Sequence, residues 1–196
     1  LHESRLTGLR LKDVNTGAER DLACDGVFIS VGRAPATELF QGELALDKSG
    51  YIIADGATRT SIPGVFACGN VVHVHDLVDF FSGESETAGA AAAAYVQNGE
   101  IETETVLPLA AGEGIGYTVP QHIRLDGVQK SVSVSFRVRR NYGPSTITVR
   151  CGPNKIAAFK RERLAPGEME HITLPKALLQ KANGPLTVAV EEVPQS

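Results

Sequence analysis

The chain has 196 residues, of which 42% are hydrophobic and 21% charged, with a net charge of −4 at pH 7. This is a globular composition, and the length allows one large domain or two small ones. No apolar run approaches the roughly 20 residues of a membrane-spanning helix, so no membrane span is expected. The three cysteines lie far apart without a Cys-x-x-Cys pair, which favours free thiols and a cytoplasmic location over a disulfide framework.

The first predicted elements are antiparallel strands within residues 5–31. Apolar side chains alternate there, and Asn15-Thr16-Gly17 supplies a turn. The nearly continuous apolar run Val27–Val31 predicts a strand that is buried on both faces, as strands of an α/β sheet are. The loop Gly32-Arg33-Ala34-Pro35 ends this strand.

Short elements are predicted after this loop. We expect a helical turn around Glu38–Phe40 and a strand near Tyr51–Ala54. Pro63-Gly64 forms a turn, and the small and apolar residues Val65–Cys68 then predict a buried strand. That strand ends at Gly69-Asn70. A glycine and a short polar side chain at this position are typical of a strand end that holds a ligand.

One helix is predicted over residues 84–97, where alanine predominates. Ser82 is its expected N-cap, and Asn98-Gly99 its expected end. A polar and acidic stretch follows up to residue 105, and we expect the boundary between two domains there.

Residues 106–196 differ from the preceding ones in both pattern and charge. Apolar and polar residues alternate over 131–139, 146–150 and 186–190, with turn residues between them, which predicts an antiparallel β-sandwich. Residues 1–105 hold 7 Lys and Arg against 16 Asp and Glu, a net charge of −9, whereas residues 106–196 hold 12 against 7, a net of +5. This asymmetry indicates two domains, 1–105 and 106–196.

Two motifs in the first domain resemble a known family. Thr60–Val71, TSIPGVFACGNV, resembles the second FAD-binding motif of the pyridine nucleotide-disulfide oxidoreductases, especially their thioredoxin-reductase-like branch, where the typical form is T-x-x-P-G-V-F-A-x-G-D. Asp25–Thr37 is similar to the segment D-G-V-F-x-x-x-G-x-x-P-N-T of the same family. The sequence departs from the family at Asn70, where Asp is usual, and at Ala36, where Asn is usual.

The resemblance implies a fold class and a cofactor site. Residues 1–105 would be the C-terminal part of a doubly wound α/β fold that binds FAD and NAD(P), and residues 106–196 an added all-β sandwich. Gly69 and Asn70 would lie against the ribityl-phosphate part of FAD, because ligands of such sheets bind at the carboxyl ends of strands. Main-chain N–H groups at the start of the next helix would face the flavin carbonyl. The implied cofactor-binding residues are Gly32, Arg33, Gly69, Asn70, Val71, Leu77, Val78 and Asp79.

The Gly-rich fingerprints that bind dinucleotides have the form Gly-x-Gly-x-x-Gly, and the sequence contains none, nor a redox Cys-x-x-Cys. In the family these parts precede the matched segments. The resemblance therefore implies a fragment whose parent is an FAD-dependent NAD(P)H oxidoreductase, with NAD(P)H bound through the missing N-terminal part. The isolated chain is expected to be inactive, and none of its residues is assigned a catalytic role.

The segment His73-Val74-His75, with Asp76 and Asp79, leaves three interpretations open. Its side chains suit a metal ion, because alternating histidines on an extended segment share a face and imidazole with carboxylate binds zinc or iron. They also suit polar contacts with the flavin, or a plain loop. The resemblance favours flavin contacts, so we expect no metal site.

A basic cluster in the second domain leaves three interpretations as well. It can be a solvated face, a surface that docks on the acidic first domain or a partner subunit, or a nucleic-acid site. Nucleic acid is disfavoured because no aromatic stacking platform accompanies the charges. The cluster consists of Arg137, Arg139, Arg140, Arg150, Lys155, Lys160, Arg161 and Arg163.

The function expected for the parent is electron transfer between NAD(P)H, FAD and an acceptor or partner subunit. The family suggests a dehydrogenase-type partner. The alternative is a non-catalytic docking module with an incomplete flavin site. Half a parallel sheet leaves an open strand edge, which invites pairing with another chain. We therefore expect a homodimer formed through residues 1–105.

Overall fold

The computed structural model of this chain describes residues 5–30, 32, 34–100 and 105–193. The chain divides into two compact units, one ending at residue 33 and the other beginning at residue 34. Each unit is described by itself below. In the described ranges, no helix is long and apolar enough to cross a membrane.

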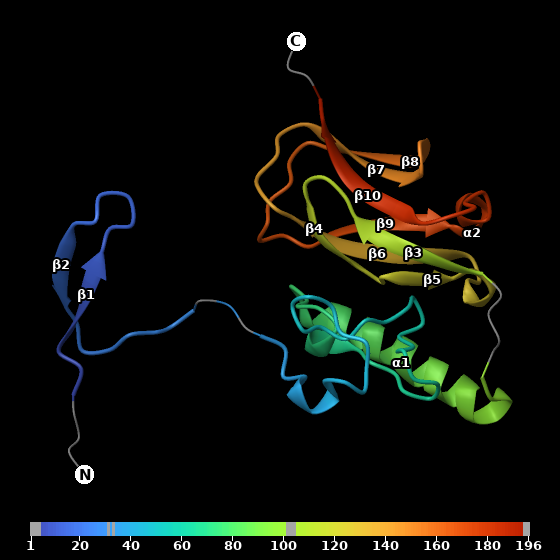
Figure 1. The fold of residues 1–196 in the computed structure, drawn as a ribbon, viewed down its shortest axis with the longest axis horizontal. Helices are drawn as coiled ribbons and strands as arrows, with labels where there is room; N and C mark the ends of the chain where they lie inside the picture. Colours follow the sequence, from blue (N-terminus) through green and yellow to red (C-terminus); the bar gives the residue numbers. More distant parts are fainter. Residues whose placement is uncertain (1–4, 31, 33, 101–104, 194–196) are drawn as a thin grey trace. The chain divides into compact units, whose positions relative to one another are not determined.

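The first unit is built on a two-stranded antiparallel sheet of β1 (Gly8–Lys12) and β2 (Glu19–Ala23), shown in Figure 1. Between the strands, Gly17 has a φ of +73°, a conformation that glycine adopts without strain. Across the strands, Arg10 Nε lies 2.8 Å from Asp21 Oδ1. The prediction of antiparallel strands and a turn in this region is confirmed.

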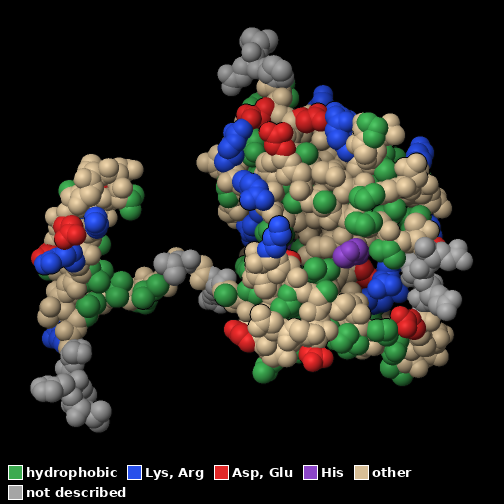
Figure 2. Space-filling view, in the orientation of Figure 1, with side chains coloured by type: hydrophobic (Ala, Val, Ile, Leu, Met, Phe, Trp, Pro, Cys, Tyr) green, Lys and Arg blue, Asp and Glu red, His purple; other side chains and the backbone are tan. Residues whose placement is uncertain are grey.

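The buried strand predicted over Val27–Val31 is wrong for the residues that can be compared, because 27–30 form no strand and Val31 lies outside the described residues. Phe28 is 101% exposed and Ile29 79%. Figure 2 shows the apolar side chains of this segment on the surface of the first unit. A strand can be buried on both faces only between neighbouring strands and covering helices. No such neighbour is described for 27–30 within this unit, so the apolar run is exposed.

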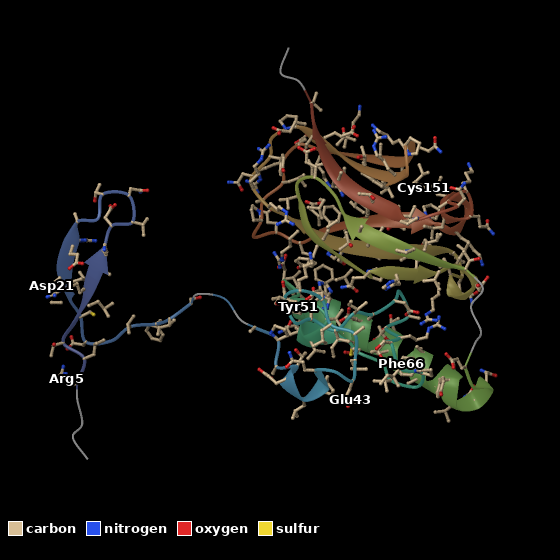
Figure 3. All side chains as sticks on the ribbon, viewed as in Figure 1. Arg5, Asp21, Glu43, Tyr51, Phe66 and Cys151 are labelled. Atoms are coloured by element: carbon tan, nitrogen blue, oxygen red, sulfur yellow. The ribbon has the colours of Figure 1, made fainter. Side chains whose placement is uncertain are left out.

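The second unit begins with an irregular segment, residues 34–77. The predicted helical turn is confirmed as the 3-10 helix η1 (Glu38–Phe40). The two predicted strands are instead isolated bridges, Leu46↔Ile52 and Arg59↔Phe66. Tyr51 and Phe66, labelled in Figure 3, mark this segment. Each apolar run is only a few residues long and is followed by a turn, so it offers too few backbone groups for a continuous ladder.

A small core nevertheless holds this segment together. Its members are buried and come from the irregular chain and from one later strand. They are Leu44, Ile52, Ala54, Ala67, Val72 and Val119. Because Val119 belongs to the β-rich half of the unit, the segment packs directly against that half.

The long helix α1 (Val78–Asn98) begins six residues before the predicted start at 84. Ser82, predicted as the N-cap, lies inside the helix, where its hydroxyl donates to the Val78 carbonyl oxygen at 3.4 Å. The residue at the N-cap is Leu77. The predicted end is confirmed, since Gly99 follows the last helical residue with a φ of +75°. The start was misplaced because Val78-Asp79-Phe80-Phe81 lacks the alanines that supplied the helix signal further along the chain.

Residues 105–193 are rich in strands. The structure describes β3 (Val106–Ala111), β4 (Ile115–Val119), β5 (His122–Arg124), β6 (Ser131–Val138), β7 (Ser145–Cys151), β8 (Asn154–Arg161), β9 (Glu170–Pro175) and β10 (Leu186–Glu192), with the 3-10 helix η3 (Leu125–Gly127) and the short helix α2 (Lys176–Leu179). The alternating stretches of the sequence coincide with β6, β7 and β10. Those strand predictions are confirmed.

These strands form two sheets, in the orders β5-β3-β10-β7-β8 and β4-β6-β9. Fully buried side chains from both sheets, such as Phe136, Ile147 and Val188, belong to one core. The sheets are not purely antiparallel as predicted, because β10 runs parallel to β3 and antiparallel to β7. Alternation fixes which face of a strand is buried but not the direction in which the strand runs.

Specific contacts join residues 34–100 to the strands. Asp55 forms a parallel bridge with His122, and Arg124 Nε lies 2.9 Å from Asp55 Oδ2. Figure 1 shows α1 and the irregular segment together on one side of the sheets. The domain boundary expected at residue 105 stays a prediction.

Candidate functional site

The motif Gly69-Asn70-Val71 forms a single 3-10 turn, η2 (Gly69–Val71), just before the long helix. Gly69 is buried and has a φ of +76°, and a Cβ atom on it would lie 3.3 Å from the ring of Phe81. Its N–H donates to the Glu84 carboxylate. Asn70 is exposed and Val71 half-buried. The glycine is therefore required for the backbone path, while the Asn70 side chain is accessible to a ligand.

The start of α1 offers a second set of ligand-binding groups. Leu77, the N-cap residue, provides no side-chain hydrogen bond to the first turn. The first N–H groups of a helix have no partner inside the helix, and the helix dipole makes this end favourable for an anion or a carbonyl oxygen. Leu77 and Val78 are 58% and 76% exposed, and Asp79 is exposed as well. The three residues predicted from the family thus lie at the start of the helix.

The structure brings together only part of the predicted cofactor set. Gly69, Asn70 and Val71 lie in η2, and Leu77 to Asp79 lie at the beginning of α1. Gly32 belongs to the first unit and has a φ of +99°. Arg33 lies outside the described residues.

A cluster of two histidines and a glutamate lies behind the motif. His75 Nε2 is 3.0 Å from Glu84 Oε2, and His73 Nε2 is 3.6 Å from Glu84 Oε1. The two imidazole rings lie 4.1 Å apart, centroid to centroid. Both histidine side chains are almost fully buried, at 3% and 5% exposure. The extended segment thus places its histidines against the first turns of α1.

Glu84 is held in its charged form by these neighbours. Burial alone would raise the pKa of Glu84, but the contacts with His73 and His75 and the hydrogen bond from the Gly69 N–H outweigh it. The pKa of Glu84 therefore lies below its ordinary value. A carboxylate at this position links the motif turn to the helix.

Asp76, grouped with the histidines in the sequence, faces a different partner. Its carboxylate pairs with Arg137 of β6 and accepts the Met169 N–H at 2.6 Å. Arg137 also donates to the Val74 carbonyl oxygen at 3.3 Å. Burial opposes the charge of Asp76, but these hydrogen bonds outweigh it and lower the pKa of the carboxyl group. Asp76 therefore ties the histidine segment to the sheets.

A pocket of about 380 Å³ opens beside the histidine cluster. Its walls include His75, Glu84, Asp79 and His171. His171 Nδ1 lies 3.0 Å from Ser135 Oγ, while its Nε2 is buried and has no hydrogen-bond partner in the part of the chain that the structure describes. Burial, followed by the nearby His73, lowers the pKa of His171. The pocket thus combines three imidazoles, three carboxylates and several hydroxyls.

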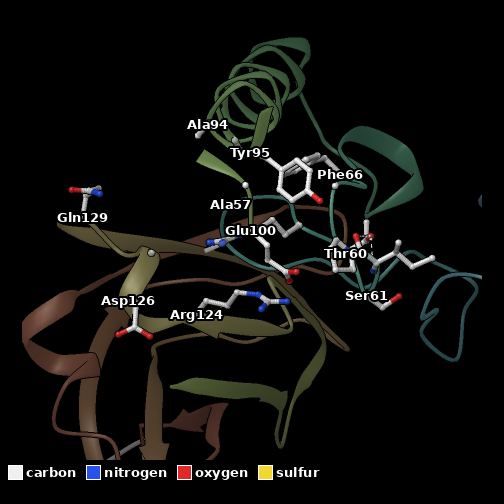
Figure 4. A pocket seen from close by; sticks show the side chains of 17 residues that line it. Ala57, Thr60, Ser61, Phe66, Ala94, Tyr95, Glu100, Arg124, Asp126 and Gln129 are labelled. Carbon is white, nitrogen blue, oxygen red and sulfur yellow. Dashed lines mark hydrogen bonds between the residues drawn. The ribbon is translucent and has the colours of Figure 1, made fainter. Parts of the chain in front are cut away.

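A second pocket, of about 260 Å³, lies at the other end of α1 (Figure 4). Tyr95 and Phe66 line it on one side and Arg124 on another. Arg59 and Arg124 both form ion pairs with the buried Asp55, with N–O distances of 3.1 and 2.9 Å. Because Asp55 pairs with these arginines and Glu100 and Asp126 also line the pocket, the pocket has little net attraction for an anion.

The basic cluster of the second half is largely paired with acidic side chains of the same chain. This pairing favours the interpretations as a solvated face and as an internal docking surface over a nucleic-acid site. The pairs are Arg137–Asp76, Arg140–Glu192, Arg150–Glu191, Lys155–Glu191, Arg161–Glu170 and Arg163–Glu168.

All three cysteines are free. Cys68, next to the motif glycine, is half-buried and has its sulfur 3.8 Å from Ser85 Oγ. Cys151, labelled in Figure 3, is buried, and its thiol donates to Asn183 Oδ1 at 3.4 Å. These contacts agree with a packing role for both residues.

Sequence reasoning did not identify Glu84, Arg137 or His171 as partners of the motif region. Glu84 was treated only as the first residue of the predicted helix, and Arg137 as one charge of the basic cluster. Glu84 and Arg137 approach the histidine segment through hydrogen bonds that span 9 to 63 positions, and His171 comes from a strand far along the chain. No local spacing rule carries such information.

The geometry of η2 and the start of α1 agrees with a match to a protein family. A turn that requires glycine, placed directly before a long helix with an uncapped first turn, is an arrangement suited to binding a nucleotide cofactor. The sequence profile of the family described as pyridine nucleotide-disulphide oxidoreductase matches residues 2–100, just over half of the chain. The chain therefore belongs to this oxidoreductase family.

Within the family, the relatives are thioredoxin reductases. The protein from Streptomyces clavuligerus is 55% identical over 71 residues, which are 36% of this chain and 22% of the relative. The protein from Streptomyces coelicolor is 48% identical over 71 residues, with the same coverage. The chain thus spans about 22% of the length of these relatives. The expected thioredoxin-reductase-like branch is confirmed.

Solved structures gave matches of the same kind. A crystal structure of T. acidophilum thioredoxin reductase shares 35% sequence identity, with a TM-score of 0.44, and the match covers 47% of this chain and 31% of that one. Thioredoxin reductase from Streptococcus pyogenes shares 34% identity, with a TM-score of 0.36 and the same coverage.

Proposed function

We propose that this chain is the C-terminal part of an FAD-dependent oxidoreductase that moves electrons between NAD(P)H, FAD and an acceptor or partner subunit. The observation that carries the proposal is the motif turn Gly69–Val71 at the foot of α1 in a chain of this family. Residues 1–105 would complete a doubly wound FAD-binding fold together with a further part of the protein. Residues 106–196 would be an added β-sandwich domain.

The residues present fit a flavin cofactor. The exposed amide of Asn70 can hydrogen-bond a ribityl hydroxyl, although the family usually has a carboxylate there. The first N–H groups of α1, around Leu77 to Asp79, receive no side-chain cap from Leu77 and suit an electron-rich flavin carbonyl. When bound, FAD would supply the two-electron chemistry, and these residues would bind and orient it.

Exposed apolar surface in both units supports an incomplete cofactor fold. Phe28 and Ile29 are exposed in the first unit, and no residue of α1 is buried. Monomeric proteins seldom leave contiguous apolar surface uncovered. The remaining part of the FAD domain would cover this surface and supply the Gly-rich fingerprints.

The electron acceptor and the partner subunit are part of the same proposal. A dehydrogenase-type partner subunit could exchange electrons with the flavin. A cytoplasmic location agrees with the three free cysteines.

The proposal is tested by titrating FAD into the purified chain and following flavin fluorescence. We expect saturable binding that Asn70→Ala weakens about 5-fold, because one net hydrogen bond contributes about 1 kcal/mol. Asn141→Ala, an exposed amide in the second half of the chain, is the matched control and should leave the affinity unchanged.

The affinities of Asn70→Ala and Asn141→Ala for FAD are then compared in a protein that is extended N-terminally by the rest of the proposed FAD domain. That protein should retain flavin, and NAD(P)H should bleach its visible absorbance. An extended and folded protein that neither retains nor binds FAD would show the proposal to be wrong.

A further inference from the structure

The cluster behind the motif has the donor set of a metal site. His73, His75 and Glu84 each offer one ligand atom, and these atoms all lie within 4.8 Å of one another. We propose that these three residues bind a divalent first-row transition-metal ion, for which zinc is the natural probe. The proposal departs from the expectation of no metal that was drawn from the sequence, and it does not depend on the flavin.

The distances from the two imidazoles to the carboxylate are close to the ligand spacing around a tetrahedral ion. Zinc binds imidazole nitrogen and carboxylate oxygen at about 2.0–2.2 Å, so two ligands of one tetrahedral ion lie about 3.3 Å apart. His75 Nε2 is 3.0 Å from one oxygen of Glu84, and His73 Nε2 is 3.6 Å from the other. Shifts of a few tenths of an ångström at each ligand would bring both nitrogens to this spacing from the carboxylate.

His73 lacks the partners that a buried imidazole normally has. It is 2% exposed, its Nδ1 has no hydrogen-bond partner among the described residues, and its Nε2 lies beyond hydrogen-bond distance of Glu84. Burying a polar group without a hydrogen bond is costly. His75 alone is enough to form a hydrogen bond between the segment after the motif and Glu84 of α1. That hydrogen bond therefore does not explain why His73 is buried beside them. An ion bound to Nε2 gives this buried side chain a partner.

The carboxylate is also oriented as a ligand would be. The Gly69 N–H donates to Oε2 of Glu84, which leaves Oε1 toward His73. Carboxylates that bind metals are commonly held by such an outer hydrogen bond. The adjoining pocket of about 380 Å³ gives solvent access to the cluster, so a water molecule can complete the coordination.

Two imidazoles and one carboxylate also define the chemical class of the ion. Imidazole suits zinc, copper, iron and nickel, whereas calcium and magnesium prefer oxygen ligands only. The site should therefore take up Zn²⁺ and Co²⁺ and should ignore Mg²⁺ and Ca²⁺.

The test is a titration of the FAD-free chain with Co²⁺, followed by visible absorbance, and with Zn²⁺, followed by calorimetry. We expect one ion per chain, displacement of Co²⁺ by Zn²⁺, and no competition from Mg²⁺. Glu84→Gln and His75→Ala should each weaken Zn²⁺ binding by more than about 100-fold, since loss of an outer partner alone costs about 10–100-fold.

Matched controls lie close by. Glu86→Gln changes an exposed carboxylate two residues further along the same helix, and His122→Ala removes a histidine outside the cluster. Both should bind Zn²⁺ as the unmodified chain does. Circular dichroism checks that each variant is folded, and His73→Ala replaces any variant that is not.

A folded chain that takes up neither ion at micromolar concentration would overturn the proposal. Equal affinities of the Glu84→Gln and Glu86→Gln variants would overturn it too. Because no FAD is present, either result leaves the proposed flavin function to its own test.

Discussion

Gly69 is subject to two independent constraints. Its φ of +76° lies in the left-handed region, where a side chain costs about 1–2 kcal/mol, and the Phe81 ring occupies the space next to it. Its N–H is bound by Glu84. The residue therefore fixes the path of the turn, and its substitution is a poor probe of ligand binding alone.

We predict that Gly69→Ala lowers the free energy of unfolding by about 1–2 kcal/mol. The control is Gly89→Ala in the interior of α1, where a Cβ atom would meet nothing within 4 Å. That change should stabilise the chain by about 0.5–1 kcal/mol, because alanine is the better helix former. Urea denaturation measures both values. If Gly69→Ala and Gly89→Ala changed the free energy of unfolding in the same direction, this account of Gly69 would be contradicted.

At this scale the sequence predicted the motif but not its surroundings. Gly69-Asn70 and the helix-start residues Leu77 to Val78 could be inferred from the family pattern. The roles of Glu84 and Arg137 could not, because hydrogen bonds between distant residues leave no local signal. The exposure of Phe28 could not be predicted either, because an apolar run has the same sequence pattern whether or not another part of the protein covers it.

Among the elements, the extended segment before α1 is joined to the sheets through Asp76. Asp76 pairs with Arg137 of β6 and accepts the Met169 N–H, which precedes β9. Two strands thus hold one carboxylate. The contact fixes the position of the histidines relative to the sheets, and it rests on one charged side chain.

We predict that Asp76→Asn lowers the free energy of unfolding by about 1–2 kcal/mol at pH 7, as expected when a hydrogen bond to a charged group is weakened. Glu86→Gln, which removes an exposed carboxylate of α1, should change it by less than about 0.5 kcal/mol. If the two substitutions lowered the free energy of unfolding equally, the contacts of Asp76 with Arg137 and the Met169 N–H would not be stabilising as we expect.

The stabilisation by the contacts of Asp76 with Arg137 and the Met169 N–H should also depend on pH in a defined direction. The pKa of Asp76 in the folded chain is below its ordinary value of 3.8, so the folded state favours the ionised form. Its contribution is complete above pH 3.8 and is lost as the pH falls through the folded-state pKa. The difference in unfolding free energy between the unmodified chain and Asp76→Asn should therefore shrink in that acidic range. A difference that grows on acidification would contradict this sign.

Elements with long, regular patterns were predicted well. β6, β7 and β10 alternate over most of their length, and Gly99 ends α1 as expected. The predicted strands near residues 51–54 and 65–68 failed, because a short apolar run forms a strand only when a partner strand is available to pair with it.

The described residues form one large core and one small one. The large core joins both sheets, whereas the small one holds residues 44–72 against Val119. Residues 5–30 contribute to neither core. The homodimer expected through residues 1–105 stays a prediction, and the exposed segment 27–29 is the surface on which we now base it.

We predict that the chain is dimeric at micromolar concentration and that Phe28→Ser makes it monomeric. Phe28 is 101% exposed, and its burial against a second copy would remove a large apolar surface from water. Leu39→Ser, which changes another residue that is 90% exposed, should leave the dimer intact. Light scattering distinguishes the two states, and a monomeric unmodified chain would contradict the prediction.

The position of β10 has a consequence for synthesis. This last strand lies between β3 and β7, so it alone joins β5-β3 to β7-β8 in the larger sheet. Its buried residues, Leu186 and Val188, also belong to the large core. While the ribosome still covers Leu186–Glu192, the sheet remains in two pieces with open edges. A nascent chain that stalls before β10 has emerged therefore exposes strand edges prone to aggregation, and the larger sheet can close only after this strand has left the ribosome.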